Sequence, residues 1–215
     1  MNEVKIYSVA DVHGRLSRLG KIKANIDKTK PDVVVIAGDI TRYWNPAPFI
    51  KELAGLSIPI LIILGNSDSS KIALLAGLHP GILNLHLRDV VINNTQFTGV
   101  SGTIPVPFRS RICLKEKAIL QKLSPLVNRE TVLVAHPPPF GTLDRVLKKF
   151  HAGSKGIDNL INKNQPKLFL CGHIHENLGI MKINQTLVVN CSMGWQGEGA
   201  LISLSQDSDP DVCFL

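Results

Sequence analysis

The sequence is short of aromatic residues and of paired cysteines. Phe, Trp and Tyr make up 5% of the 215 residues, too few for an obvious base-stacking platform of the kind that binds single-stranded nucleic acid. No two of the four cysteines form a CxxC pair, so a zinc ribbon is not expected, and at this chain length neither is a disulfide framework. We expect buried thiols in a reducing compartment at all four positions, Cys113, Cys171, Cys191 and Cys213.

Long hydrophobic runs are also lacking. The longest, residues 58–64, is interrupted by Pro59 and is far shorter than the roughly 20 apolar residues that a membrane-spanning helix needs. Residues 1–5 lack the basic start and the apolar run of a signal peptide. A soluble cytoplasmic protein without a membrane partner is therefore the expectation.

The chain is basic, with 24 Lys and Arg against 17 Asp and Glu and a formal net charge of +7. A basic balance favours anionic partners, but solubility explains it equally well, because the lysines are scattered as on the solvated faces of helices. A nucleic-acid partner is not favoured, since no dense basic cluster is present. With 44% hydrophobic residues and no repeat or linker, residues 1–215 are expected to form a single domain.

Apolar strand-like segments alternate with amphipathic helical ones in the first third of the chain. Residues 33–37 are continuously apolar and β-branched, which is typical of a strand buried on both faces. The order β-α-β-α-β-α indicates an α/β fold that binds ligands at the carboxyl ends of its strands. The expected elements are strands at 4–10, 33–37 and 58–64, helices at 15–29 and 71–76, and a loop with a short helix at 44–55.

The later part of the chain changes from βα units to strands and hairpins. Residues 90–98 predict a hairpin with an Asn-Asn turn, residues 99–108 predict a loop, and residues 140–155 predict a mobile flap over the strand ends. The remaining expected elements are helices at 114–123 and 156–162 and strands at 131–135, 167–170, 178–183, 186–189, 200–204 and 211–214.

Polar residues follow the predicted strands. Taken singly, each has an ordinary explanation as a helix cap, a turn residue or a hydrogen-bonding histidine. Together they supply two carboxylates, one amide and four imidazoles, which are ligands for transition metals. We expect His173 and His175 to leave their strand on one side, as an extended i, i+2 pair. The candidates are Asp11, His13, Asp39, Asn66, His136, His173 and His175, whereas the remaining histidines, His79, His86 and His151, are interpreted as surface or packing residues.

These residues stand in five ordered motifs, each after an apolar strand: Asp11-Val12-His13, Gly38-Asp39, Gly65-Asn66-Ser67-Asp68, His136, and Gly172-His173-Ile174-His175. In this order the sequence resembles the calcineurin-like metallophosphoesterases, over nearly the whole chain. Residues 136–144, 153–154 and 171–176 resemble the Icc-related branch of that family. The resemblance implies a four-layer α/β/β/α fold, with two mixed β-sheets packed face to face and helices outside.

The resemblance also implies the metal ligands. Asp11, His13, Asp39 and His175 would hold one divalent ion, and Asp39, Asn66, His136 and His173 a second, with Asp39 shared. Mixed nitrogen and oxygen donors without a thiolate suit Mn²⁺, Fe, Ni²⁺ or Zn²⁺, and Mn²⁺ is the expectation. Such a pair generates a bridging hydroxide for in-line attack on a phosphate ester. The catalytic residues implied are Asp39, Asn66 and His136, with Asp68 orienting a ligand.

The sequence departs from the family at Ser67. Many members carry a histidine there, which is thought to stabilise the transition state or to protonate the leaving group. A serine hydroxyl is not a cation near neutral pH, so the departure favours substrates with good leaving groups, such as aryl phosphodiesters. Arg42, Arg109 and Arg111 are candidates to reach a substrate phosphate, although single arginines are more often surface residues.

The expected function is therefore a dinuclear-metal phosphoesterase, acting most readily on phosphodiesters. The enzymatic alternative is a phosphomonoesterase or nucleotide pyrophosphatase. A non-catalytic metal-binding scaffold on the same fold is the alternative from another class. The sequence leaves the physiological substrate, the native metals and the oligomeric state open.

Overall fold

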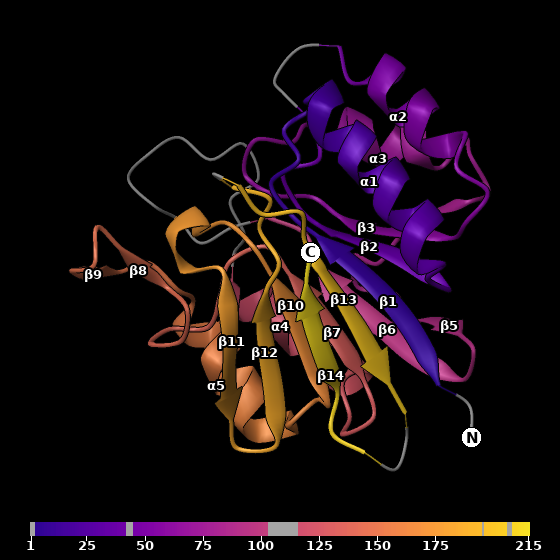
Figure 1. Cartoon of the computed structure of the whole chain (residues 1–215). Helices are drawn as coiled ribbons and strands as arrows, with labels where there is room; N and C mark the ends of the chain where they lie inside the picture. The colour runs from indigo at the N-terminus through magenta and orange to yellow at the C-terminus, as the bar shows by residue number, and fades with distance from the viewer. Residues whose placement is uncertain (1–2, 42–44, 103–115, 195, 206–207) are drawn as a thin grey trace.

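The structure is a computed structural model that describes residues 3–41, 45–102, 116–194, 196–205 and 208–215. Several predictions concern residues outside these ranges, namely Arg42, Arg109, Arg111, Cys113 and most of the predicted loop at 99–108. Two six-stranded sheets and a small two-stranded one make up the β-structure of the described part. Figure 1 shows their arrangement with the helices.

The first sheet is parallel at its centre and has the strand order β14-β13-β1-β2-β3-β4. β1, β2, β3 and β4 pair in parallel, while β13 pairs antiparallel with both β1 and β14. The strands are β1 (Val4–Val9), β2 (Val33–Ala37), β3 (Ile60–Ile63), β4 (Ile82–Asn84), β13 (Ala200–Leu204) and β14 (Asp211–Phe214).

The second sheet is also mixed and has the order β11-β12-β10-β7-β6-β5. Its four central strands pair in parallel, and β11 and β5 are antiparallel edges. The strands are β5 (Val90–Ile92), β6 (Thr95–Val100), β7 (Val132–Ala135), β10 (Leu168–Cys171), β11 (Gly179–Ile183) and β12 (Thr186–Asn190).

Helices cover the outer faces of both sheets, so the molecule has four layers (Figure 1). The first sheet packs against α1 (Leu16–Thr29), α2 (Ala47–Ala54) and α3 (Lys71–Ala76). The second packs against α4 (Glu116–Leu123) and α5 (Lys155–Asn164). The predicted α/β/β/α sandwich is confirmed.

β2 shows how the sequence specifies these layers. Alternate side chains of a strand point to opposite faces. Val33 and Val35 enter the core between the two sheets, which also contains Val132 and Leu168 of the second sheet. Val34 instead packs beneath the helices. A strand buried on both faces must therefore be apolar at every position, as the sequence of β2 is.

Most predicted elements are present with ends shifted by one or two residues, but some features differ. β4 was not predicted, and neither were the 3-10 turns η1 (Ser124–Leu126) and η2 (His175–Asn177). The expectation of buried cysteines is right for Cys171 and Cys191 and wrong for Cys213, which is exposed on the edge strand β14. No helix among the described residues is long and apolar enough to cross a lipid bilayer.

The segment predicted as a flap forms a small hairpin of β8 (Arg145–Val146) and β9 (Phe150–His151). It begins just after the His136 strand exit and docks on η2. Leu147 N donates to Glu176 Oε2 at 2.8 Å, and Asn177 Nδ2 donates to the Arg145 carbonyl. The hairpin thus follows the candidate ligand His136 in sequence and contacts the turn that begins with the candidate ligand His175. Its mobility stays a prediction.

Candidate metal centre

The candidate ligands gather at the carboxyl ends of the central strands of both sheets. Asp11 and His13 follow β1, and both have left-handed backbone conformations, with φ of 59° and 53°. Asp and His tolerate this conformation better than most residues. The turn is held against the exit of β2, because Asp11 N donates to Gly38 O at 3.0 Å and His13 N donates to Asp39 O at 2.8 Å.

Asp39 is almost completely buried at the end of β2 and also has a positive φ, 52°. Its carboxylate occupies space that Gly65, at the end of β3, leaves free. A Cβ at Gly65 would lie 2.2 Å from Asp39 Oδ1, well inside the 3.4 Å at which ordinary contact begins. The glycine of the Gly65-Asn66 motif is therefore required for the approach of Asp39.

His136 is fully buried at the exit of β7. Its Nδ1 lies 2.8 Å from the carbonyl oxygen of Ala37. A carbonyl only accepts, so Nδ1 carries a proton and Nε2 faces the site. Nε2 lies 3.1 Å from Asn66 Oδ1 and 3.5 Å from Asp39 Oδ1. His136, Asn66 and Asp39 thus converge from three different strands.

His173 and His175 reach the site, but not as an extended pair. His173 has a φ of 70°, and His175 begins η2. The prediction of an extended pair is therefore wrong, because the left-handed backbone at His173 turns the chain before His175. The His173 ring lies 5.0 Å from the His136 ring, and the His175 ring lies 5.6 Å from the His13 ring.

Gly172 allows this turn to approach the first sheet. A Cβ there would lie 2.3 Å from Ala10 Cβ and 2.8 Å from Asp11 Oδ2. The next residue donates its backbone N–H to the same carboxylate, from His173 N to Asp11 Oδ2 at 3.0 Å. Gly172 therefore brings this turn close to the Asp11 segment.

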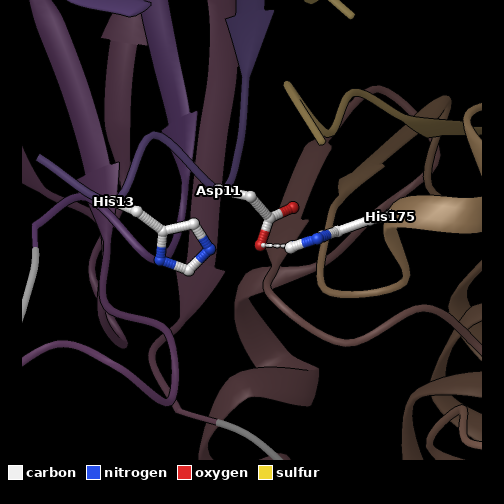
Figure 2. A group of neighbouring side chains, drawn as sticks. All are labelled: Asp11, His13 and His175. Atoms are coloured by element: carbon white, nitrogen blue, oxygen red, sulfur yellow. Dashed lines mark ion pairs between the residues drawn. The ribbon is translucent and has the colours of Figure 1, made fainter. Parts of the chain in front are cut away.

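Two overlapping groups of the described side chains could each hold a metal ion. One consists of Asp11, His13 and His175, and the other of Asp11, Asp39 and His136. Figure 2 shows Asp11 between the two histidines of the first group. Asp11 is common to both groups, whereas the family resemblance makes Asp39 the shared ligand. Asp39 Oδ2 lies 3.8 Å from His13 Nδ1, so it too is near both groups.

Asp11 supplies a direct test of whether a metal fits. Its Oδ1 is buried and has no hydrogen-bond partner among the described residues. The nearby nitrogens are His175 Nε2 at 3.2 Å, in an ion-pair contact, and His136 Nε2 at 3.8 Å. A buried carboxylate oxygen without a donor is costly. A cation at the centre of these oxygen and nitrogen donors would satisfy it, so the residues fit a divalent metal.

The charge states of Asp39 and His173 suit the same role. Burial by itself would raise the pKa of Asp39, but the charge of His136 and hydrogen bonds from His136 and Ser67 hold it below its ordinary value. Burial lowers the pKa of His173 to about 4, assisted by the charge of His136. The carboxylate is therefore ionised and His173 is neutral near pH 7, which are the protonation states that ligate metals.

Asp68 binds the backbone of two ligand-bearing loops. It is completely buried and accepts N–H bonds from Ile40 and Thr41 at 3.0 Å and from Gly65 at 2.9 Å. Burial raises the pKa of Asp68 to about 6, and the charge of Asp39 contributes. Asp68 thus ties the Asp39 loop to the Asn66 loop through main-chain atoms.

The sequence motifs did not single out Arg18, which is buried in α1. Its guanidinium donates to the carbonyl oxygens of Asp11 and Gly194, two segments far apart in the chain. No local signal marks this residue, since an arginine in an amphipathic helix ordinarily faces solvent. The other histidines behave as expected for packing residues where contacts are described: His86 Nδ1 accepts from Ser101 N, and His151 Nδ1 pairs with Asp144 at 2.7 Å.

The fold and the donor set together define a protein of two packed mixed sheets with a candidate metal site at the carboxyl ends of their strands. The chain belongs to the calcineurin-like phosphoesterase family, whose sequence model matches residues 4–177. It is accordingly a phosphoesterase, and the family implies divalent metal ions at the Asp and His cluster. The finer assignment to the Icc-related branch stays a prediction.

Individual proteins are similar to this chain in sequence or in fold. The uncharacterized protein MJ1162 of Methanocaldococcus jannaschii is 34% identical over 199 residues, covering 88% of each chain. The solved structure of TT1561 of Thermus thermophilus has a TM-score of 0.76 at 18% identity, covering 98% of each chain. A novel archaeal phosphodiesterase has a TM-score of 0.57 at 15% identity, covering 98% of this chain and 99% of its own. The two structures share the fold with this chain.

Proposed function

We propose that the protein is a phosphodiesterase that works with two divalent ions, Mn²⁺ in the first instance. The observation that carries the proposal is the pair of overlapping groups that could each hold a metal ion, which contain five of the predicted ligands. The other two lie beside His136: Asn66 Oδ1 is 3.1 Å from His136 Nε2, and the His173 ring is 5.0 Å from the His136 ring. Asp11, His13, Asp39 and His175 would hold one ion, and Asp39, Asn66, His136 and His173 the other. Bound there, the ions would polarise the attacking water and neutralise charge on the phosphoryl oxygens.

The chain's own residues prepare the site for an anion. Asp11 and Asp39 are its two carboxylates, and the pKa of each is held below its ordinary value, because histidine contacts outweigh the effect of burial. Asn66 contributes a neutral oxygen, which cancels no metal charge. Two divalent ions with two carboxylates leave a net positive centre, which favours an anionic phosphate ester.

The expected preference for substrates with good leaving groups draws on position 67. A leaving group with a high pKa needs a proton as it departs. Ser67, where many relatives carry a histidine, offers one hydroxyl, and that hydroxyl donates to Asp39 Oδ2 at 2.6 Å. Substrates whose leaving group departs as a stable anion, such as aryl diesters, do not need this proton. The fold shared with a solved archaeal phosphodiesterase is consistent with this class.

The test is hydrolysis of bis-p-nitrophenyl phosphate against p-nitrophenyl phosphate, after chelation and reloading with Mn²⁺. Diester turnover that is lost in Asp39→Asn supports the proposal. Asp89→Asn is the matched control, because Asp89 is exposed and outside the site.

Preferential monoester turnover would instead indicate a phosphomonoesterase. Two bound metals without turnover of either ester would favour a non-catalytic scaffold. Activity on DNA or RNA that falls steeply with salt would point to a nuclease.

A further inference from the structure

Ser67 forms hydrogen bonds to both oxygens of the Asp39 carboxylate. Its backbone N–H donates to Oδ1 at 2.8 Å, and its hydroxyl donates to Oδ2 at 2.6 Å. Ser67 lies beyond β3 and Asp39 beyond β2, so these two bonds join neighbouring strand exits. Two parallel bonds from one residue fix the plane of a carboxylate as well as its position.

The two oxygens fixed in this way face different parts of the candidate centre. Oδ1 lies 3.5 Å from His136 Nε2, and Oδ2 lies 3.8 Å from His13 Nδ1. A carboxylate has about four lone-pair positions, and Ser67 occupies one on each oxygen. Each oxygen thus keeps a free position toward one of the two ligand groups. Rotation of the carboxylate would remove Asp39 from at least one of them.

Only the hydroxyl bond depends on the identity of residue 67. Any residue except proline can donate the backbone N–H, whereas the second bond needs a short side-chain hydroxyl. A serine hydroxyl also carries a single proton. While this proton is donated to Asp39, it is not available to a departing alkoxide. The Ser67 hydroxyl can therefore hold the Asp39 carboxylate or protonate a leaving group, but it cannot do both at once.

We propose that Ser67 is a positioning residue that holds the Asp39 carboxylate across the two ligand groups and does not protonate the leaving group. The proposal rests on the proposed metal site. It assigns to position 67, where many relatives have a histidine, the role of holding the shared Asp39 carboxylate. Groups that orient metal ligands typically contribute about 10- to 100-fold in metal affinity.

Mn²⁺ binding to the metal-free protein tests this directly, by calorimetry and by electron paramagnetic resonance. Ser67→Ala should weaken Mn²⁺ binding about 10- to 100-fold, and Ser67→Thr, which keeps the hydroxyl, should stay within about threefold of wild type. Ser101→Ala is the matched control. Its hydroxyl is buried and accepts from Leu64 N at 2.9 Å, so its loss should lower thermal stability and leave Mn²⁺ affinity unchanged.

Kinetics separate positioning from proton donation. Wild type and Ser67→Ala are compared on bis-p-nitrophenyl phosphate and on diphenyl phosphate, whose leaving phenol has a pKa of about 10, like that of tyrosine. Positioning predicts the same fold loss on both esters. A much larger loss on diphenyl phosphate would show that the hydroxyl protonates the leaving group and would overturn the proposal.

Unchanged Mn²⁺ affinity in Ser67→Ala would overturn it as well. The binding measurement needs no turnover, so it also separates this proposal from the proposed function. If wild-type protein binds Mn²⁺ but hydrolyses neither ester, the phosphodiesterase assignment fails. A weakened Ser67→Ala rescued by Ser67→Thr would then still support the positioning role.

Discussion

Adding one methyl group at Gly65 should destroy the metal centre without unfolding the protein. The new Cβ would lie 2.2 Å from Asp39 Oδ1 and 2.5 Å from Asp39 N. The backbone at Gly65 is not in the left-handed region, so Ala is strained by contact alone. Both the carboxylate and the backbone of Asp39 would have to retreat by about 1 Å to restore ordinary contact, whereas metal–ligand distances tolerate about 0.2 Å.

The expected loss follows from that displacement. Gly65→Ala should bind Mn²⁺ at least about 100-fold more weakly, equivalent to about 3 kcal/mol, and should lose diester turnover accordingly. Overpacking should lower the free energy of unfolding of the metal-free protein by about 1–3 kcal/mol. Calorimetric titration with Mn²⁺ and denaturant unfolding measure the two quantities separately.

Gly20→Ala provides the matched control. Gly20 is exposed inside α1, and nothing lies within 4 Å of the Cβ that would be added. The same chemical change should there raise the free energy of unfolding by about 0.5–1 kcal/mol, because Ala is the better helix former, and leave Mn²⁺ binding unchanged. Wild-type Mn²⁺ affinity in Gly65→Ala would refute the reasoning, since it would mean that Asp39 need not occupy this position.

Three further predictions concern metal removal, pH and the hydrogen bonds of a buried tyrosine. Chelation should abolish turnover and lower the melting temperature, and Mn²⁺ should restore both, because the buried carboxylate Asp11 is left without its cation; an unchanged melting temperature would contradict this. Burial by itself would lower the pKa of His136, but Asp39 and its other contacts raise it to about 9. Metal ligation must displace this proton, so Mn²⁺ affinity should rise about tenfold per pH unit up to about pH 9. A pH-independent Mn²⁺ affinity would count against this prediction. Tyr7→Phe removes a hydroxyl that donates to Glu198 O and accepts from Asn25 Nδ2. The substitution should lower the free energy of unfolding, measured with denaturant, by about 1–2 kcal/mol and leave Mn²⁺ affinity unchanged. A decrease below about 0.3 kcal/mol would argue against a stabilising role of these hydrogen bonds.

The regular elements were largely predictable because their signals are local. β2 is apolar at every position, and the predicted range of 33–37 matches the strand. The helix at 71–76 was likewise predicted with the ends that the structure shows. β4 was not predicted because it has three residues and is a strand only through its pairing with β3. Exposure of Cys213 escaped as well, since whether a strand lies at an edge depends on the order of strands in space.

The composition of the candidate centre was also determined by the sequence. Asp11, Asp39 and Asn66 each follow a strand of the first sheet, whose parallel strands bring their carboxyl ends to one edge, whereas His136 follows a strand of the second sheet. The types of donor and their approximate location therefore follow from local pattern and chain order. The family resemblance adds the chemistry, because the ordered motifs occur together in one family.

Only the tertiary structure decided how these groups face one another. The left-handed backbone of His173 depends on packing against the Asp11 segment, 162 residues away. The hydrogen bond from the Ser67 hydroxyl to Asp39 joins segments distant in sequence. So do the hydrogen bonds of Arg18, which link Asp11 to Gly194 through their carbonyl oxygens. Hydrogen-bond partners of this kind lie beyond any local pattern, because they form only after the strands have taken their places in the sheets.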